Sequence, residues 1–277
     1  MDVAGTKSAR AEGRVSRNSV RKMLVGRRQD KQIRAHHGKH MEPINVVLVH
    51  GAWADGSSWS KVIPLLQDKG FNVTAAQIPL TSIEDDVAIT KRLLAAQNGP
   101  TVLVGHSYGG IVVSGAGNGS PNVKALVYIA AFALDEGESI EALGKSGPAP
   151  AGAAQIRPDA NGFLWINREG FAQAFASDVD PIQARVMAAV QKPLSVASFT
   201  GKVGAPAWKN IPSWYMVATK DQMIPPQAEE FMAKRMGATM RTVPSSHAAM
   251  VSHPKEVTDL IISAAESTRK SSVGLPG

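Results

Sequence analysis

From residue 45 onward, buried β-branched runs alternate with segments of helical spacing, and this alternation constrains the fold more than any other feature. Residues 46–49 read Val-Val-Leu-Val, a continuous apolar run of the kind found in strands buried on both faces. Apolar side chains then recur at helical spacing over residues 58–69, and Gly70 stands where a helix ends. Since strand, helix and strand in succession form a right-handed crossover, the pattern predicts a parallel sheet flanked by helices.

The same rhythm continues along most of the chain. It predicts strands at residues 46–49, 71–76, 101–104, 123–131, 213–219 and 238–243. It predicts helices at residues 58–69, 84–97, 108–117, 225–236 and 254–267. The sequence therefore predicts an α/β fold with a mostly parallel sheet.

The rhythm stops between residues 135 and 208. This stretch is rich in Gly, Pro and Ala with scattered aromatic residues, and it is too long for a connecting loop without structure of its own. We therefore expect a helical cap at 135–208, inserted into a core made of residues 43–134 and 209–270.

The net charge of +7 lies entirely in residues 1–42, which hold 11 Lys and Arg residues against 4 Asp and Glu residues. The rest of the chain holds 19 of each kind, so its charges balance. A basic arm can bind nucleic acid or an anionic membrane, but a folded body with balanced charge has no excess positive charge for such binding. We expect residues 1–42 to be a disordered basic extension and the folded body to bind no nucleic acid.

Composition excludes several other classes. The chain has no cysteine, which excludes disulfides, thiolate nucleophiles and Cys-ligated metals. No apolar run approaches the ~18–20 residues of a membrane span, and residues 1–42 lack the apolar core of a secretory signal. A transit peptide is conceivable because acidic residues are few, although Ser is not abundant. We expect a cytoplasmic protein whose fold begins near Met41. His36, His37 and His40 could hold a metal only loosely, and we expect no metal site.

Gly105-His106-Ser107-Tyr108-Gly109 matches the pattern G-x-S-x-G between a predicted strand and a predicted helix. This is the context of a nucleophile elbow, a turn so sharp that a side chain in place of either glycine would crowd the serine. Ser107 would stand at a helix N-terminus, where free N–H groups favour developing negative charge. The alternative is a structural turn rich in glycine, but the context favours Ser107 as a nucleophile.

A serine hydroxyl needs a base to take its proton, and the chain has seven histidines. His247 follows the last predicted strand, at the carboxyl edge of the sheet where ligands bind in parallel α/β folds. His50 and His106 end strands at the same edge, and we expect them to pack or to form hydrogen bonds. His253 precedes Pro254 at the start of the final helix. We therefore predict His247 as the base, with His253 as the alternative.

The base in turn needs an acid that fixes its tautomer and stabilises the imidazolium. Asp221 follows strand 213–219 at the same sheet edge, and the order Ser, Asp, His is one that proteins with a nucleophile elbow use. Asp135, after strand 123–131, is the alternative. Asp178 and Asp180 fall in the cap, where we expect helix caps or surface charge.

The negative oxygen of the reaction intermediate must also be held, and backbone N–H groups suit this because they are preorganised. One donor is expected from Tyr108, the residue after the nucleophile. The other is expected from the loop after the first strand, with Ala52 as the candidate, although His50-Gly51 there fits a plain tight turn as well. Trp53 beside it is the residue we expect to contact a substrate.

Four motifs together resemble the α/β-hydrolase superfamily, and more narrowly the small esterases related to plant methylesterases and hydroxynitrile lyases. They are His50–Trp53, Gly105–Gly110, Asp221–Pro225 and Ser246-His247. The resemblance spans about residues 44–268 and leaves the basic tail uncovered. It implies an α/β-hydrolase fold without a cofactor. The lyases carry Thr after the first-strand His and Lys after the catalytic His, where this chain has Gly51 and Ala248.

The resemblance and the motifs together predict a serine carboxylic ester hydrolase that acts on a small or medium ester through an acyl-enzyme. Lyase or perhydrolase activity at the same site is the enzymatic alternative. A ligand receptor that keeps the fold and its triad is the alternative without catalysis. We expect a small-molecule ester as the partner, while the oligomeric state and the ester itself do not follow from the sequence.

Overall fold

The structure is a computed structural model that describes residues 43–273. The expectations for residues 1–42, His36, His37 and His40 among them, lie outside the described residues. Within the described range no helix is both long and apolar enough to cross a membrane.

Six strands form one sheet in the order β2-β1-β3-β4-β8-β9, and every neighbouring pair is parallel. Their bounds are β1 Asn45–Val49, β2 Asn72–Ala75, β3 Thr101–His106, β4 Val123–Ile129, β8 Ser213–Ala218 and β9 Thr239–Val243. All residues of β1 and β3 are buried, as expected of central strands covered on both faces. The prediction of a mostly parallel sheet is confirmed.

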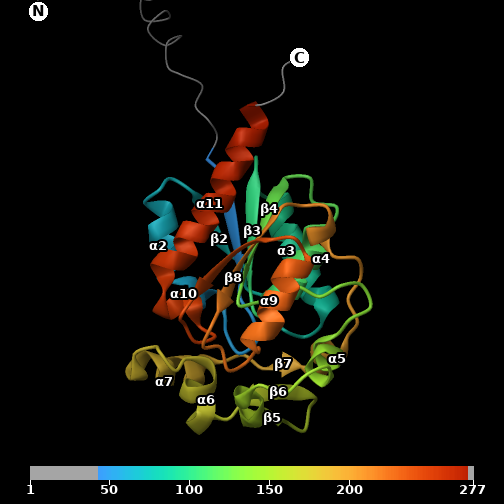
Figure 1. Ribbon diagram of the computed structural model, residues 1–277, viewed down its shortest axis with the longest axis vertical. Coiled ribbons are helices and arrows are strands. Elements are labelled where there is room, and N and C mark those ends of the chain that lie inside the picture. Colours follow the sequence, from blue (N-terminus) through green and yellow to red (C-terminus); the bar gives the residue numbers. More distant parts are fainter. Residues whose placement is uncertain (1–42, 274–277) are drawn as a thin grey trace, which may run out of the picture. The chain divides into compact units, whose positions relative to one another are not determined.

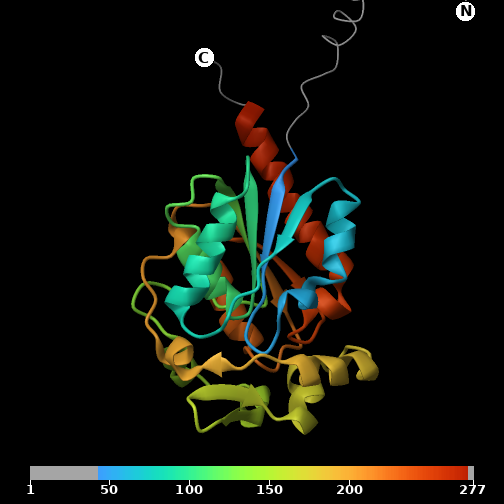
Figure 2. The same ribbon diagram turned by 180° about the vertical axis from the view of Figure 1, so that it is seen from behind.

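Helices cover both faces of this sheet. In Figures 1 and 2, α3 and α4 lie on one face, while α2 and α11 lie on the other. The helices and the 3₁₀ turn that flank the sheet on its two faces are η1 Gly56–Trp59, α2 Val62–Gln67, α3 Ile83–Ala95, α4 Gly109–Ala116, α9 Pro226–Arg235, α10 Ala249–Ser252 and α11 Pro254–Val273. Most boundaries shift by one or two residues from those predicted, and two helices differ more. The helix expected at 58–69 is divided into η1 and α2, because Pro64 has no N–H to donate to the carbonyl of Ser60. The last helix runs beyond residue 267.

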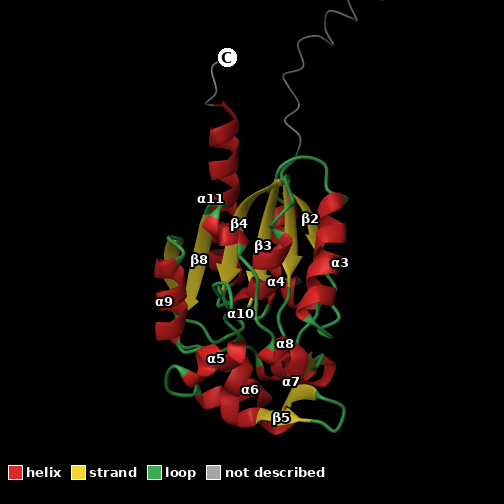
Figure 3. Ribbon diagram, turned by 90° about the vertical axis from the view of Figure 1, so that its right-hand side faces the viewer, coloured by secondary structure: helices red, strands yellow, loops and turns green. Residues whose placement is uncertain are grey.

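Residues 135–208 are here called the cap segment. Residues 140–200, its larger part, lie beyond the carboxyl ends of the strands (Figure 3), whereas residues 202–206 lie beside residues 111–118 of the core. The segment holds the predicted helices together with a three-stranded antiparallel sheet in the order β5-β6-β7, which the sequence did not predict. These strands have two to four residues, too few to show an alternating pattern. The elements are α5 Ile140–Lys145, η2 Ala151–Gln155, β5 Ile156–Pro158, β6 Phe163–Ile166, α6 Arg168–Phe175, α7 Pro181–Val190, β7 Leu194–Ser195 and α8 Val196–Thr200, followed by η3 Ala207–Lys209. That this segment is a domain apart from the core stays a prediction.

Candidate active site

Ser107 stands in the sharp turn that joins β3 to α4, and its backbone adopts the left-handed conformation with φ 54°. This conformation is strained for a residue with a side chain and is held by the elements on either side. A Cβ atom on Gly105 would lie 2.6 Å from the carbonyl oxygen of Gly109, and one on Gly109 would lie 2.6 Å from that of Val49. Glycine is therefore required on both sides of Ser107, which explains the G-x-S-x-G pattern.

The imidazole of His247 reaches the Ser107 hydroxyl from the loop between β9 and α10. Its Nε2 lies 2.8 Å from Ser107 Oγ. His247 is fully buried, while Ser107 is 4% exposed and faces the cavity described below. The pair therefore has the geometry in which an imidazole can take the hydroxyl proton.

Asp221 lies on the other side of the imidazole, just after β8, with its Oδ2 at 2.6 Å from His247 Nδ1. Its Oδ1 accepts hydrogen bonds from the backbone N–H groups of Met223 at 2.7 Å and Ile224 at 3.0 Å. Burial opposes the ionised form, but the neighbouring His247 and these hydrogen bonds hold the pKa of Asp221 below its usual value. Asp221 is therefore a carboxylate, and His247 Nδ1 carries the proton that it shares with Asp221.

His106 supports the backbone of this histidine loop. Its Nε2 lies 2.7 Å from the carbonyl oxygen of His247. Burial lowers the pKa of His106 to about 3, so the ring is neutral and Nε2 donates its proton to that carbonyl. The ring of Phe175, from α6 in the cap segment, meets the His247 ring edge to face at 4.9 Å between centroids. His106 thus packs and forms a hydrogen bond, as predicted.

His50 has a similar supporting part in the loop after β1. Its Nδ1 donates to the Gly51 carbonyl at 2.8 Å, and its Nε2 accepts the N–H of Ile78 at 3.2 Å. Burial lowers the pKa of His50 to about 4, so this ring is also neutral. His253, the alternative base, precedes α11 and contacts Ser252 and Asp178 rather than Ser107.

The other aspartates have different partners. Asp135, the alternative acid, forms an ion pair with Lys209 at 2.7 Å. Asp180 caps α7 by accepting the N–H of Gln183, as predicted for a cap residue. Asp178 is an exposed surface charge, one of the two roles predicted for it, and it also accepts the N–H of Ser246 at 3.1 Å in the loop that carries His247.

Ala52 and Tyr108 are the residues predicted to donate to the oxyanion. Both line the cavity in front of Ser107. Among residues 43–273, neither backbone N–H has a hydrogen-bond acceptor, so both remain available to a ligand. The Tyr108 hydroxyl donates to buried Asp86 at 2.6 Å, which anchors this residue of the cavity lining to α3.

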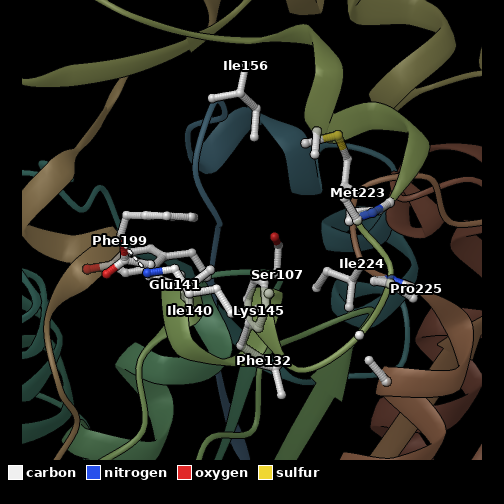
Figure 4. A pocket seen from close by; sticks show the side chains of 18 of the residues that line it. Ser107, Phe132, Ile140, Glu141, Lys145, Ile156, Phe199, Met223, Ile224 and Pro225 are labelled. Carbon is white, nitrogen blue, oxygen red and sulfur yellow. Dashed lines mark hydrogen bonds and ion pairs between the residues drawn. The ribbon is translucent and has the colours of Figure 1, made fainter.

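A cavity of about 790 Å³ opens in front of Ser107 (Figure 4). In Figure 4, Ile140 and Phe199 lie on one side of Ser107 and Met223, Ile224 and Pro225 on the other. Ile156 lies across the cavity, and Phe132 lies beneath Ser107. Two residues of the lining, Glu141 and Lys145, carry charges, and these pair with each other at 2.9 Å. The cavity therefore offers mainly apolar side chains to whatever it binds.

Trp53 lies in this lining, as predicted for a substrate contact. It also joins the core to the cap segment, since its N–H donates to Lys192 and its indole Nε1 donates to the Leu164 carbonyl, at 2.9 and 2.8 Å. Its backbone has φ 59°, so the loop after β1 is as constrained as the turn at Ser107.

One residue beside the triad escaped the sequence analysis. Glu229, on α9, is fully buried, and its carboxyl group lies beside that of Asp221. A signal was present in the sequence: Glu229 shares a helix face with the buried Met232, at the spacing of a core position. Within the described range there is no group of three or more His, Asp or Glu side chains placed to hold a metal ion.

The chain is similar in sequence to a known protein family and to several characterised proteins. The family model described as the alpha/beta hydrolase family matches residues 46–260. A carbendazim hydrolyzing esterase from a Nocardioides species is 32% identical over 40% of the chain, a match that spans about half of that protein, 52%. Methylesterase 1 of Arabidopsis thaliana is 24% identical over 79% of the chain and 95% of its own length.

Among solved structures, a pyrethroid hydrolase from Sphingobium faniae superimposes with a TM-score of 0.71 and 23% identity, covering 82% of this chain and 99% of the other. At this level of identity, the likeness shows a shared fold. It confirms the predicted fold class, in which the elbow after β3 stands at the carboxyl edge of the sheet.

Proposed function

Because the chain belongs to the alpha/beta hydrolase family, whose model covers residues 46–260, we propose that it is a serine esterase that forms an acyl-enzyme. The observation that carries this proposal is the continuous chain of contacts from Ser107 through His247 to Asp221, with distances of 2.8 and 2.6 Å. Relatives that include a methylesterase and a carbendazim hydrolyzing esterase support ester hydrolysis as the reaction class.

In the proposed reaction, Ser107 Oγ attacks the ester carbonyl carbon while His247 Nε2 takes the hydroxyl proton. Asp221 stabilises the imidazolium, and the N–H groups of Ala52 and Tyr108 hold the oxyanion. Each such donor contributes roughly 2.7–4 kcal/mol to transition-state stabilisation. The intermediate collapses as His247 gives its proton to the leaving alcohol. A water molecule, activated by the same histidine, then releases the acid and restores Ser107.

The size and lining of the cavity support a proposal for the class of ester. Its volume of about 790 Å³ falls in the range of pockets that bind drug-sized molecules, and its lining is mainly apolar. The charges of Glu141 and Lys145 neutralise each other, which leaves no charge to compensate one on the substrate. An unpaired charge costs much to bury in such surroundings. We infer that the substrate is a neutral, apolar ester of medium size.

Two positions favour an esterase over a hydroxynitrile lyase, the alternative enzyme at this site. A Cβ atom on Gly51 would lie 2.8 Å from both the His106 carbonyl oxygen and Ser107 Cβ, so the threonine of the lyases has no room there. Ala248 is fully buried, and it stands where the lyases carry their cationic lysine. Without that charge the site has no group for a leaving cyanide.

The test is turnover of p-nitrophenyl esters with acyl chains of increasing length, together with neutral aryl esters. We expect product release that saturates with substrate, that favours apolar acyl groups over carboxylate-bearing ones, and that is lost in Ser107→Ala. Binding without turnover would favour a receptor, cyanide release from a cyanohydrin a lyase, and peracid formation a perhydrolase. A cytoplasmic location stays a prediction that cell fractionation would check.

A further inference from the structure

Glu229 is a buried carboxyl group that takes no part in the proposed reaction. It lies in the first turn of α9, eight residues after Asp221, and its side chain has no exposed surface. Its Oε2 accepts the N–H of Ala218, the last residue of β8, at 2.8 Å. Its Oε1 receives no hydrogen from any donor among residues 43–273. A buried carboxylate oxygen without a donor is costly, so this atom calls for an explanation.

Asp221 supplies that explanation. The carboxyl group of Asp221 lies beside that of Glu229 in the core, close enough for the two groups to interact directly. Two carboxylates only accept hydrogen bonds and repel each other, so this buried pair can bond only if one of them carries a proton. Asp221 already accepts hydrogens from His247 and from two backbone N–H groups, whereas Glu229 accepts one. The proton therefore belongs on Glu229.

The charges around Glu229 agree with this placement. Burial and the neighbouring negative charge of Asp221 raise the pKa of Glu229 well above its usual value. The other titratable groups that face it are Tyr215 of β8 and Glu230 on its own helix, and neither supplies a cation. Glu229 therefore stays neutral while Asp221 stays ionised.

We propose that Glu229 is a positioning residue of the active site, whose neutral carboxyl group donates a hydrogen bond to Asp221 and holds that carboxylate against His247 Nδ1. The inference rests on the proposed function. In this arrangement one side chain ties together the end of β8, through Ala218, and the loop that carries Asp221. This bond adds to the donors that already surround both Asp221 oxygens, and it further restrains the carboxylate against rotation away from the imidazole. Glu229 keeps its proton throughout turnover, so the step needs no further acid or base.

The experiment compares two substitutions at Glu229 with a matched control on the same helix. In Glu229→Gln, the amide oxygen can accept the Ala218 N–H and the amide nitrogen can donate to Asp221, as a neutral acid does. In Glu229→Leu both hydrogen bonds are lost. Glu230→Gln is the control, because Glu230 pairs only weakly with Lys234 at 3.9 Å and is partly exposed.

We expect Glu229→Gln and Glu230→Gln to keep the kcat and the pH profile of the wild type. Glu229→Leu should lower kcat roughly 10–100-fold with little change in KM, the usual cost of losing a residue that orients a functional group. Its acid limb of kcat/KM should also move to higher pH, because Asp221 without this donor stabilises the imidazolium more strongly. A residue that merely filled space would leave the acid limb in place.

Infrared difference spectra between wild type and Glu229→Gln test the proton without relying on activity. At neutral pH the wild type should show the C=O band of a protonated carboxyl group, which Glu229→Gln lacks. A missing band overturns the proposal, and so does a loss of activity in Glu229→Gln equal to that in Glu229→Leu. If the wild type turns over no ester, the proposed function fails, and the band alone decides whether Glu229 carries the proton.

Discussion

Ser107 is the residue on which the reaction depends most directly. Because its hydroxyl is the only nucleophile proposed, Ser107→Ala should lower kcat for a p-nitrophenyl ester about 10⁶-fold, leaving residual catalysis by the oxyanion donors. The change removes one hydroxyl group, so the thermal unfolding midpoint should stay near that of the wild type. A variant that kept more than about a tenth of the wild-type rate would show that another group attacks the ester.

The acid of the triad can be tested against its alternative. Asp221→Asn should lower kcat by about 10⁴, since an amide stabilises the wrong tautomer of His247. Asp135→Asn should change kcat little, because Asp135 pairs with Lys209 instead. Steady-state kinetics on both variants decide between them, and the reverse pattern would move the acid to the segment after β4.

The pH dependence of kcat/KM distinguishes His247 from His253 as the general base. A general base acts only in its unprotonated form, so kcat/KM of the wild type should fall tenfold per pH unit on the acid side, with one titrating group. The limb should vanish in His247→Ala, whose residual rate no longer depends on that proton, and should persist in His253→Ala. A limb lost in His253→Ala but kept in His247→Ala would assign the base to His253.

At the scale of elements, helix α3 carries a buried carboxyl group, that of Asp86, which contacts Tyr108. Asp86 accepts the Leu80 N–H at 2.8 Å and the Tyr108 hydroxyl at 2.6 Å. Burial raises the pKa of Asp86 from 3.8 to about 6. Since the folded state then binds this proton more tightly than the unfolded state, stability falls as pH rises through this interval and stays lower above it.

Replacing Asp86 by Asn should remove this dependence. Urea unfolding between pH 4 and 7 should show that Asp86→Asn gains stability relative to wild type as pH rises. Asp85→Asn, one residue earlier on the same helix, is the control, because Asp85 is exposed and its pKa is lowered rather than raised. A difference between wild type and Asp86→Asn that did not vary with pH would mean that this carboxyl group does not titrate in the interval.

The elements also show what the sequence could and could not predict. Parallel strands and the triad were predictable because both follow local rules: β-branched runs mark the strands, and each triad residue follows a strand at one sheet edge. The placement of Glu229 beside Asp221 is not local in this sense, because it depends on the packing of α9 against β8. The same holds for Asp178, which finds its partner in the loop of His247. Strands β5–β7 were missed because segments so short pair through their tertiary surroundings.

For the whole molecule, the excess of positive charge lies in the N-terminal segment, and deleting residues 1–40 tests what this segment contributes. No residue of the proposed site precedes Pro43, and the residues after Glu42 carry balanced charge. Deleting residues 1–40 should therefore leave the ester turnover rate and the thermal unfolding midpoint close to those of the full chain. The deletion also removes the whole excess of Lys and Arg, so retention on heparin or DNA resins should weaken. Replacing the Lys and Arg residues of this stretch with Gln is the matched control, since it removes charge but keeps length. Loss of folding or of turnover in the deleted chain, with the Gln variant still active, would show that this segment stabilises the fold through contacts other than charge.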